Sequence, residues 1–251
     1  MNETHEELLE ISKEILNVKE NLDPRVFSEN GKIHNLLRQR LLHRARYMVQ
    51  ETIGSTKGLE VGDIVLLGSS ASYFYRPASD LDVKIEVINE SCPYLPAFKE
   101  CEDGFTKYLS SLTSFFFSDH QKFFIGKRFL DIKLAPKVWD YAWTGIYSLT
   151  NNKWLVLPRK DIAKDFTAET LVQYYYVRCQ EIDDFVNSFP KSGGKYSQEQ
   201  CNEMFYYYKT QVLDRNQTIE DYLAFKIIKA TGKLKELGSW VFNNQLKTLE
   251  F

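Results

Sequence analysis

The feature that most constrains the fold of this chain is the run of residues 61–87, in which two strand-like segments flank a turn of small residues. Residues 63–67 are mostly apolar, and residues 68–70 form a Gly-Ser-Ser turn directly after them. From residue 80 to residue 87, charged and apolar side chains alternate. Alternation with a period of two is typical of a strand that buries one face. The run therefore predicts two strands of one sheet.

Two acids open the second of these strands. Asp80 and Asp82 are two positions apart, so in a strand they project to the same side with Cα atoms roughly 6.5–7 Å apart. Like charges in this position repel each other unless a positive group lies between them. A hard cation that prefers oxygen ligands, such as Mg²⁺, meets this need. The alternative is an ordinary sheet whose acids are neutralised by Lys84 and Lys133, which alternate onto the same faces.

The order of these elements resembles a known signature. An apolar strand that ends in Gly68-Ser69, a spacer of about ten residues and then Asp80-Leu81-Asp82 is similar to the motif of the polymerase-β-like nucleotidyltransferase superfamily. That superfamily also needs a third acid on a later strand. Asp131 fits, because it is the one acid within the strand-like residues 128–134. The resemblance covers residues 60–135.

The resemblance implies an α/β (α+β) fold, in which a mixed β-sheet is flanked by helices and followed by a helical C-terminal domain. From about residue 161 the pattern changes to long helical periodicities. We therefore expect residues 1–160 to form the catalytic domain, N-terminal helices included, and residues 161–251 to form the helical domain.

The activity implied by the resemblance is transfer of a nucleoside monophosphate from a nucleoside triphosphate to a hydroxyl acceptor, with release of pyrophosphate. Two Mg²⁺ ions, or Mn²⁺ in their place, serve such a reaction. By resemblance, Asp80 and Asp82 bind the ion on the nucleotide side, and Asp131 completes the second site as a ligand or base. The acceptor stays open: a nucleic acid, a protein, a small molecule or a second nucleotide all fit the three acids.

The turn and the spacer supply the candidate nucleotide-binding residues. Gly68 lets the backbone approach a triphosphate closely, and Ser69 offers a hydroxyl and an N–H group to its oxygens. Ser70 is a candidate for a second contact of this kind, and Ser79 for a hydrogen bond to the loop or to a carboxylate. Arg76 is a candidate phosphate ligand, with an exposed loop arginine as the alternative.

Other classes of function stay open. Many members of the superfamily carry a further glycine in the spacer, whereas residues 71–78 contain none and include a proline. This departure leaves room for a catalytically idle regulatory module that binds nucleotide or nucleic acid. A net charge of −2 gives no global attraction for nucleic acid, so such binding needs a local patch. Arg40 and Arg44, on a predicted helix, are the candidates for it, or for a triphosphate contact.

The remaining patterns predict mainly helices and a soluble protein. Predicted helices cover residues 4–22, 34–53, 97–112, 167–189, 197–213 and 218–230, and predicted strands cover residues 63–67, 80–87, 128–134 and 154–157, with short apolar runs at 115–117 and 123–125. The four cysteines lack paired metal-site spacing, no signal-like segment opens the chain, and no apolar run approaches the ~20 residues of a membrane-spanning helix. We therefore expect a cytoplasmic protein that does not contact a membrane.

Overall fold

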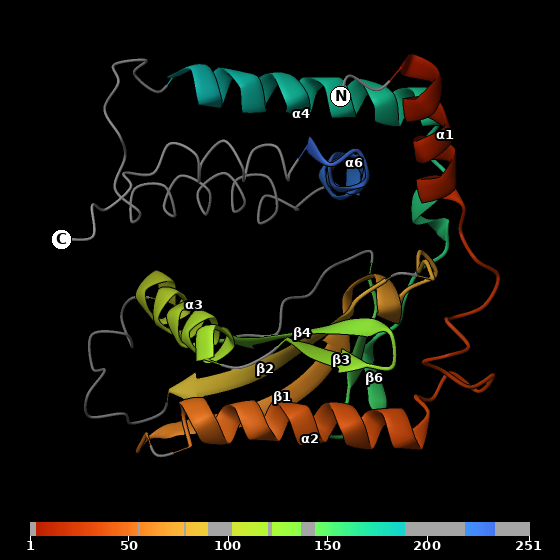
Figure 1. The fold of residues 1–251 in the computed structure, drawn as a ribbon. Helices are drawn as coiled ribbons and strands as arrows, with labels where there is room; N and C mark the ends of the chain where they lie inside the picture. Colours follow the sequence, from red (N-terminus) through yellow and green to blue (C-terminus); the bar gives the residue numbers. More distant parts are fainter. Residues whose placement is uncertain are drawn as a thin grey trace. The chain divides into compact units, whose positions relative to one another are not determined.

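The structure is a computed structural model, and it describes residues 4–54, 56–77, 79–89, 102–119, 122–136, 144–188 and 219–233. The chain divides into two compact units. One unit is Val18–Asp161, and the other combines Met1–Asn17 with Ile162–Phe251. Figure 1 shows the elements of both.

A six-stranded sheet forms the centre of the Val18–Asp161 unit, in the order β3-β4-β2-β1-β5-β6 (Figure 1). Its strands are β1 (Leu59–Leu67), β2 (Leu81–Asn89), β3 (Phe123–Ile125), β4 (Arg128–Ala135), β5 (Ile146–Ser148) and β6 (Lys153–Val156). The β2 and β4 strands are parallel, and every other neighbouring pair is antiparallel. The sheet is therefore mixed, which confirms the predicted fold class.

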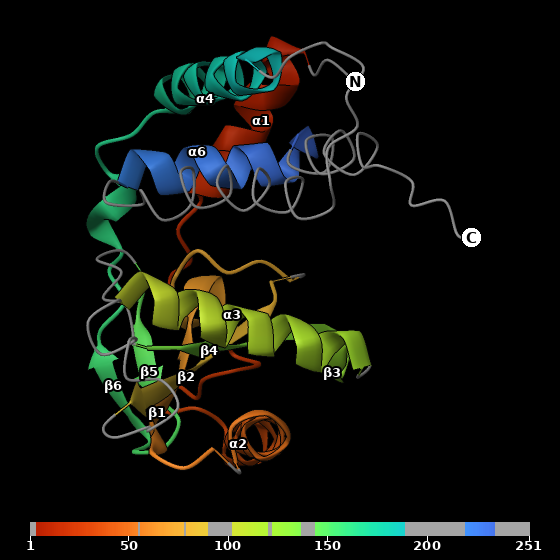
Figure 2. The same cartoon turned by 90° about the vertical axis from the view of Figure 1, so that its left-hand side faces the viewer.

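Both long helices of this unit cover the same face of the sheet. Leu41 and Met48 of α2 (Asn35–Thr52) and Leu109 of α3 (Glu102–Asp119) share one buried core with Val83 and Ile132 of the sheet. The two helices also contact each other, since the rings of Tyr47 and Phe116 meet edge to face at 6.0 Å. Figure 2 shows α3 along its length and α2 end on. Apolar burial on this scale is the main stabilising term for the sheet.

The opposite face carries the charged residues of β2 and β4. Strand alternation places Asp82 and Lys84 of β2, and Asp131 and Lys133 of β4, away from the helices. A smaller apolar cluster on β1, β5 and β6 lies on the same face as these charges, because Leu67 is the register partner of Asp82. This face of the sheet is therefore the one that carries the predicted acids.

The second unit is helical. Its described helices are α1 (His5–Leu16), α4 (Ala168–Ser188) and α6 (Ile219–Ala230), which bury Leu8, Ile15, Leu171, Tyr175 and Ile227 together. α1 begins with a capping box, because the Thr4 hydroxyl accepts from the Glu7 N–H and the Glu7 carboxylate accepts from the Thr4 N–H.

The structure differs from the sequence prediction at α1. This helix was expected to extend to residue 22 and to belong with the sheet, but it ends at Leu16 and packs with α4 and α6. The reason is that Leu22, at the end of the predicted helix, packs against the core of the sheet unit, whereas α1 packs in the core of the other unit. The predicted helix at 197–213 lies outside the described residues. Among the described helices, none is both long and apolar enough to cross a membrane.

Candidate functional site

The turn after β1 brings a glycine against an acid. Gly68 opens the short 3-10 helix η1 (Gly68–Ala71) and has a φ of 74°, a conformation that side chains disfavour. A Cβ atom at this position would also overlap the Asp82 carboxylate. The backbone angle therefore favours glycine at position 68, and a side chain there would also have to displace the end of the Asp82 side chain.

Two of the predicted acids lie side by side. Asp82 on β2 and Asp131 on β4 are register partners in the parallel pair, which sets their Cα atoms about 4.8 Å apart. Both side chains are half-buried. Since residues opposite each other on neighbouring strands point to the same face, the two carboxylates share one surface of the sheet beside Gly68.

Lysines accompany this acidic pair. The Lys133 ammonium lies 2.7 Å from Asp131 Oδ2, and the two side chains keep 49% and 27% of their surface exposed. Lys84 is the register partner of Lys133 on the next strand. An ion pair this exposed is worth about 0–1 kcal/mol. A cation or a phosphate can therefore displace the lysine from Asp131 at small cost.

Asp80 lies just before β2, in the loop that follows η1. Its carbonyl oxygen accepts a hydrogen bond from the Ser70 hydroxyl and a longer one, of 3.4 Å, from Arg128 Nη2. The backbone at Asp80 is therefore fixed from two sides. Among the residues that the structure describes, no group of three acid, histidine or cysteine side chains lies close enough to hold a metal ion.

The predicted nucleotide-binding residues divide into two kinds. Ser70 is fully buried, and its hydroxyl also accepts from Arg128 Nη2 at 2.6 Å, so it is engaged within the loop. The Ser79 hydroxyl accepts from the Arg76 N–H at 2.8 Å, which is the loop contact that was predicted for it. Ser69 is partly exposed beside Gly68. Arg76 is half-buried with its Nη2 atom shielded from solvent, so it is not an ordinary surface arginine.

Sequence reasoning missed a buried charge cluster that holds this loop. The carboxylate of Asp23, which has no exposed surface, accepts from Arg25 Nε at 2.8 Å and Arg25 Nη2 at 2.7 Å. It also accepts from Arg128 Nη1 at 3.1 Å. Burial of Arg128 lowers its pKa, whereas the hydrogen bonds that Arg25 donates to Asp23 raise the pKa of Arg25. We call Asp23, Arg25 and Arg128 the arginine clamp.

The clamp grips the backbone of the loop between the turn and β2. Arg25 Nη1 donates to the carbonyl of Pro77 at 2.9 Å, and its Nη2 donates to the carbonyl of Arg76 at 3.3 Å. Arg128 Nε donates to the carbonyl of Ser79 at 2.8 Å. The position of Asp80, one residue later, therefore depends on the clamp.

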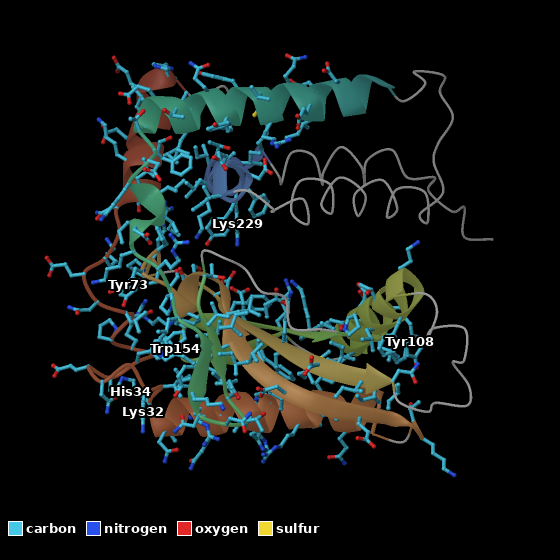
Figure 3. All side chains as sticks on the ribbon, turned by 180° about the vertical axis from the view of Figure 1, so that it is seen from behind. Lys32, His34, Tyr73, Tyr108, Trp154 and Lys229 are labelled. Atoms are coloured by element: carbon cyan, nitrogen blue, oxygen red, sulfur yellow. The ribbon has the colours of Figure 1, made fainter. Side chains whose placement is uncertain are left out.

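The segment that carries Asp23 is itself anchored to the sheet unit. The Phe27 ring stacks on Trp154 at 4.9 Å, and Trp154 Nε1 donates to the carbonyl of Gly31 at 2.9 Å. His34 Nε2 lies 2.8 Å from the carbonyl of Pro24. Figure 3 shows His34 and Trp154 near this segment. The segment that carries Asp23 is therefore held in place by packing and by hydrogen bonds.

Arg44, a candidate phosphate or nucleic-acid contact, and Tyr73, a residue of the spacer, have different surroundings. The Arg44 guanidinium lies 4.9 Å from the centre of the Phe123 ring, on a helix that covers the face of the sheet opposite Asp82. Arg44 is therefore on the opposite side of the sheet from a triphosphate bound at the acid pair. The Tyr73 ring, which is labelled in Figure 3, has the Lys160 ammonium 4.6 Å from its centre.

The fold and this site define an α/β protein with a candidate acidic site on the face of a mixed sheet that lies away from α2 and α3. No protein-family model matches the sequence. No curated protein matches it either. Among solved structures, the chain is similar to the Elizabethkingia meningoseptica CdnE cyclic dinucleotide synthase with GTP and Apcpp, at 14% identity over 97% of this chain and 82% of that chain. The TM-score is 0.24, which does not establish a common fold.

Proposed function

We propose that this chain is a Mg²⁺-dependent nucleotidyltransferase, which moves a nucleoside monophosphate from a nucleoside triphosphate to a hydroxyl acceptor. One observation carries the proposal: Asp82 and Asp131 are register partners on parallel strands, on the face away from the helices and beside Gly68. The resemblance of the Gly-Ser and Asp-x-Asp motifs to the polymerase-β-like superfamily supports the same assignment.

The residues present fit divalent ions. Asp82 and Asp131 offer adjacent carboxylate oxygens, which are the ligands that Mg²⁺ prefers, and Asp80 lies two residues before Asp82. The lysine now paired with Asp131 is exposed enough to yield its place. When bound, Mg²⁺ or Mn²⁺ would neutralise charge on the triphosphate and favour ionisation of the acceptor hydroxyl.

The chain's own side chains would position the substrates and move a proton. The backbone at Gly68 and the hydroxyl of Ser69 would hold the phosphates, with Arg76 as a further phosphate ligand. Asp131 would take the proton of the acceptor hydroxyl while the oxygen of that hydroxyl forms a bond to the α-phosphorus. The bond from that phosphorus to the bridging oxygen breaks, and pyrophosphate leaves with the electron pair. Lys84 and Lys133 would balance the charge of the leaving group.

A catalytically idle module is the second candidate, and one observation favours it. The ion pair between Lys133 and Asp131 neutralises the third acid in this structure. In that case the protein would bind a nucleotide without turning it over.

The test uses the four α-³²P-labelled nucleoside triphosphates with Mg²⁺ or Mn²⁺ and a panel of nucleic-acid, protein, small-molecule and nucleotide acceptors. We expect label transfer or pyrophosphate release that falls at least about 100-fold in Asp82→Asn. Glu60→Gln is the matched control, because Glu60 is an exposed carboxylate on the adjacent strand β1 and should leave the rate unchanged.

Two outcomes would decide against this mechanism. Activity that survives in both Asp80→Ala and Asp82→Ala would remove these acids from the reaction. Calorimetry that detects nucleotide binding while no acceptor is labelled would favour the idle module.

A further inference from the structure

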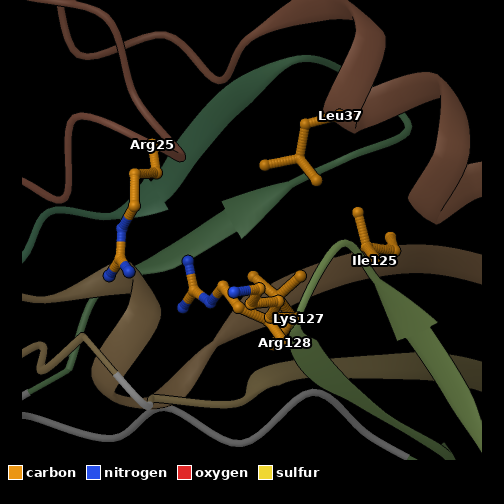
Figure 4. A pocket seen from close by; sticks show the side chains of 6 residues that line it. Arg25, Leu37, Ile125, Lys127 and Arg128 are labelled. Carbon is orange, nitrogen blue, oxygen red and sulfur yellow. The ribbon is translucent and has the colours of Figure 1, made fainter.

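We propose that a pocket of the sheet unit binds a small phosphate monoester. The pocket has a volume of about 290 Å³ and is lined by Arg25, Leu37, Leu81, Ile125, Lys127 and Arg128 (Figure 4). It collects residues from the segment before α2, from α2, from the start of β2 and from the β3–β4 hairpin. This proposal concerns binding alone and does not rest on the proposed enzymatic activity.

The pocket has an excess of positive charge. Arg25, Lys127 and Arg128 contribute three charges, and the buried carboxylate of Asp23 compensates one of them. Within the described ranges, Lys127 has no ion-pair partner, and its side chain is exposed. Asp80 is a second acid that attracts Arg128, so three positive charges less two negative charges leave at least one. A phosphate monoester carries about −1.5 to −2 at neutral pH and is attracted by this excess.

The guanidinium groups also keep hydrogen-bond donors for a ligand. Each guanidinium has five N–H groups. Arg25 donates four hydrogen bonds, to Asp23, Arg76 and Pro77. Arg128 also donates four, to Asp23, Ser70, Ser79 and Asp80. One N–H remains on each arginine, and Lys127 lines the same pocket. Burial lowers the pKa of Arg128, and an anion in the pocket would oppose that effect.

The rest of the lining is apolar. Leu37, Leu81 and Ile125 form the other wall of the pocket, and Figure 4 shows Leu37 and Ile125 apart from the cationic groups. Small-molecule pockets commonly have volumes of about 300–1,000 Å³ and are lined mainly by apolar groups. A pocket at the lower end of this range suits a ligand with one phosphate and one compact apolar group, such as a single ring.

This pocket and the acid pair are separate places on the sheet. Leu81 belongs to the core under α2 and α3, whereas Asp82 points to the other face. The arginine clamp connects them, because the same two guanidinium groups line the pocket and hold the loop before Asp80. A ligand here would therefore bind without touching Asp82.

The experiment is calorimetric titration of the full chain with phenyl phosphate, and with phenol and inorganic phosphate as comparison ligands. We expect saturable binding of phenyl phosphate and weaker binding of both comparison ligands. Lys127→Met should weaken the binding of phenyl phosphate about tenfold. This is the low end of the contribution of a hydrogen bond to a charged group, because Lys127 is exposed.

Controls locate the ligand. Lys122→Met removes an exposed lysine just before the same hairpin that does not line the pocket, and it should bind like the wild type. Asp82→Asn should also bind like the wild type, since the acid pair lies on the other face. The proposal fails if phenyl phosphate does not bind, if the two lysine variants lose affinity equally, or if Asp82→Asn abolishes binding.

Discussion

Removal of the Asp23 carboxylate tests the arginine clamp directly. Breaking a buried ion pair by deleting one partner costs about 3–5 kcal/mol, because the other charge stays buried without compensation. Arg128 keeps 12% of its side chain exposed, so we take about 3 kcal/mol for it. Arg25 is 45% exposed and adds little, but its backbone N–H loses a bond to Asp23 worth about 1 kcal/mol. Asp23→Ala should therefore destabilise the sheet unit by about 4 kcal/mol.

Hydrogen exchange of β2 is the appropriate assay, because the chain has two compact units and global unfolding need not be two-state. The predicted loss corresponds to a roughly 1,000-fold fall in the protection of β2 amides. Asp161→Ala is the control. Asp161 pairs with Arg159 while both side chains are more than half exposed, so its loss should cost less than about 1 kcal/mol. If the two variants exchange at similar rates, the clamp does not stabilise the fold as we argue.

Three further predictions concern single residues. Gly68→Ala should reduce the hydrogen-exchange protection of β2 more than Gly126→Ala does. Both substitutions cost about 1–2 kcal/mol for a positive φ, but only a Cβ at position 68 overlaps a carboxylate. Equal losses of protection would contradict this. Lys133→Met should tighten Mn²⁺ binding up to about fivefold, because it removes an ammonium that competes for Asp131. Electron paramagnetic resonance measures the bound Mn²⁺. Unchanged affinity would mean that Asp131 is not a ligand. The carboxylate of Glu169 accepts from its own N–H and from Thr167, which holds its pKa below the ordinary value of 4.5. Glu169→Gln should therefore be less stable than the wild type at neutral pH, and the difference should vanish as the pH falls through the lowered pKa. A pKa at or above 4.5 in an NMR titration of Glu169 would refute this.

Local patterns were sufficient to predict the elements that carry the acids. Alternation predicted β2 and β4, and the strand-like run 128–134 differs from β4 by one residue. The sequence also predicted that Gly68 lets the backbone approach a triphosphate closely, whereas its positive φ and its closeness to the Asp82 carboxylate were found only in the structure. Asp131 was singled out as the one acid of its run, and the parallel register places it beside Asp82.

Long-range pairing could not be predicted in the same way. Asp23 and Arg128 are 105 positions apart, and neither stands in a pattern that marks a partner. An Asp-Pro step stands directly before Arg25, but such a step indicates a break in secondary structure and not a distant partner. The short strand β5 was also missed, because three residues are too few to show a period.

The clamp gives a physical account of the spacer without a glycine. A second glycine would let the backbone adopt unusual angles at little cost. In this chain, side-chain donors hold the loop instead: the guanidinium groups of Arg25 and Arg128 bind the carbonyls of Arg76, Pro77 and Ser79. The conformation before Asp80 is thus fixed by charge-assisted hydrogen bonds, which are stronger than neutral ones. Because those donors depend on the buried carboxylate of Asp23, the geometry of the acidic site depends on a residue that lies far from it in the sequence.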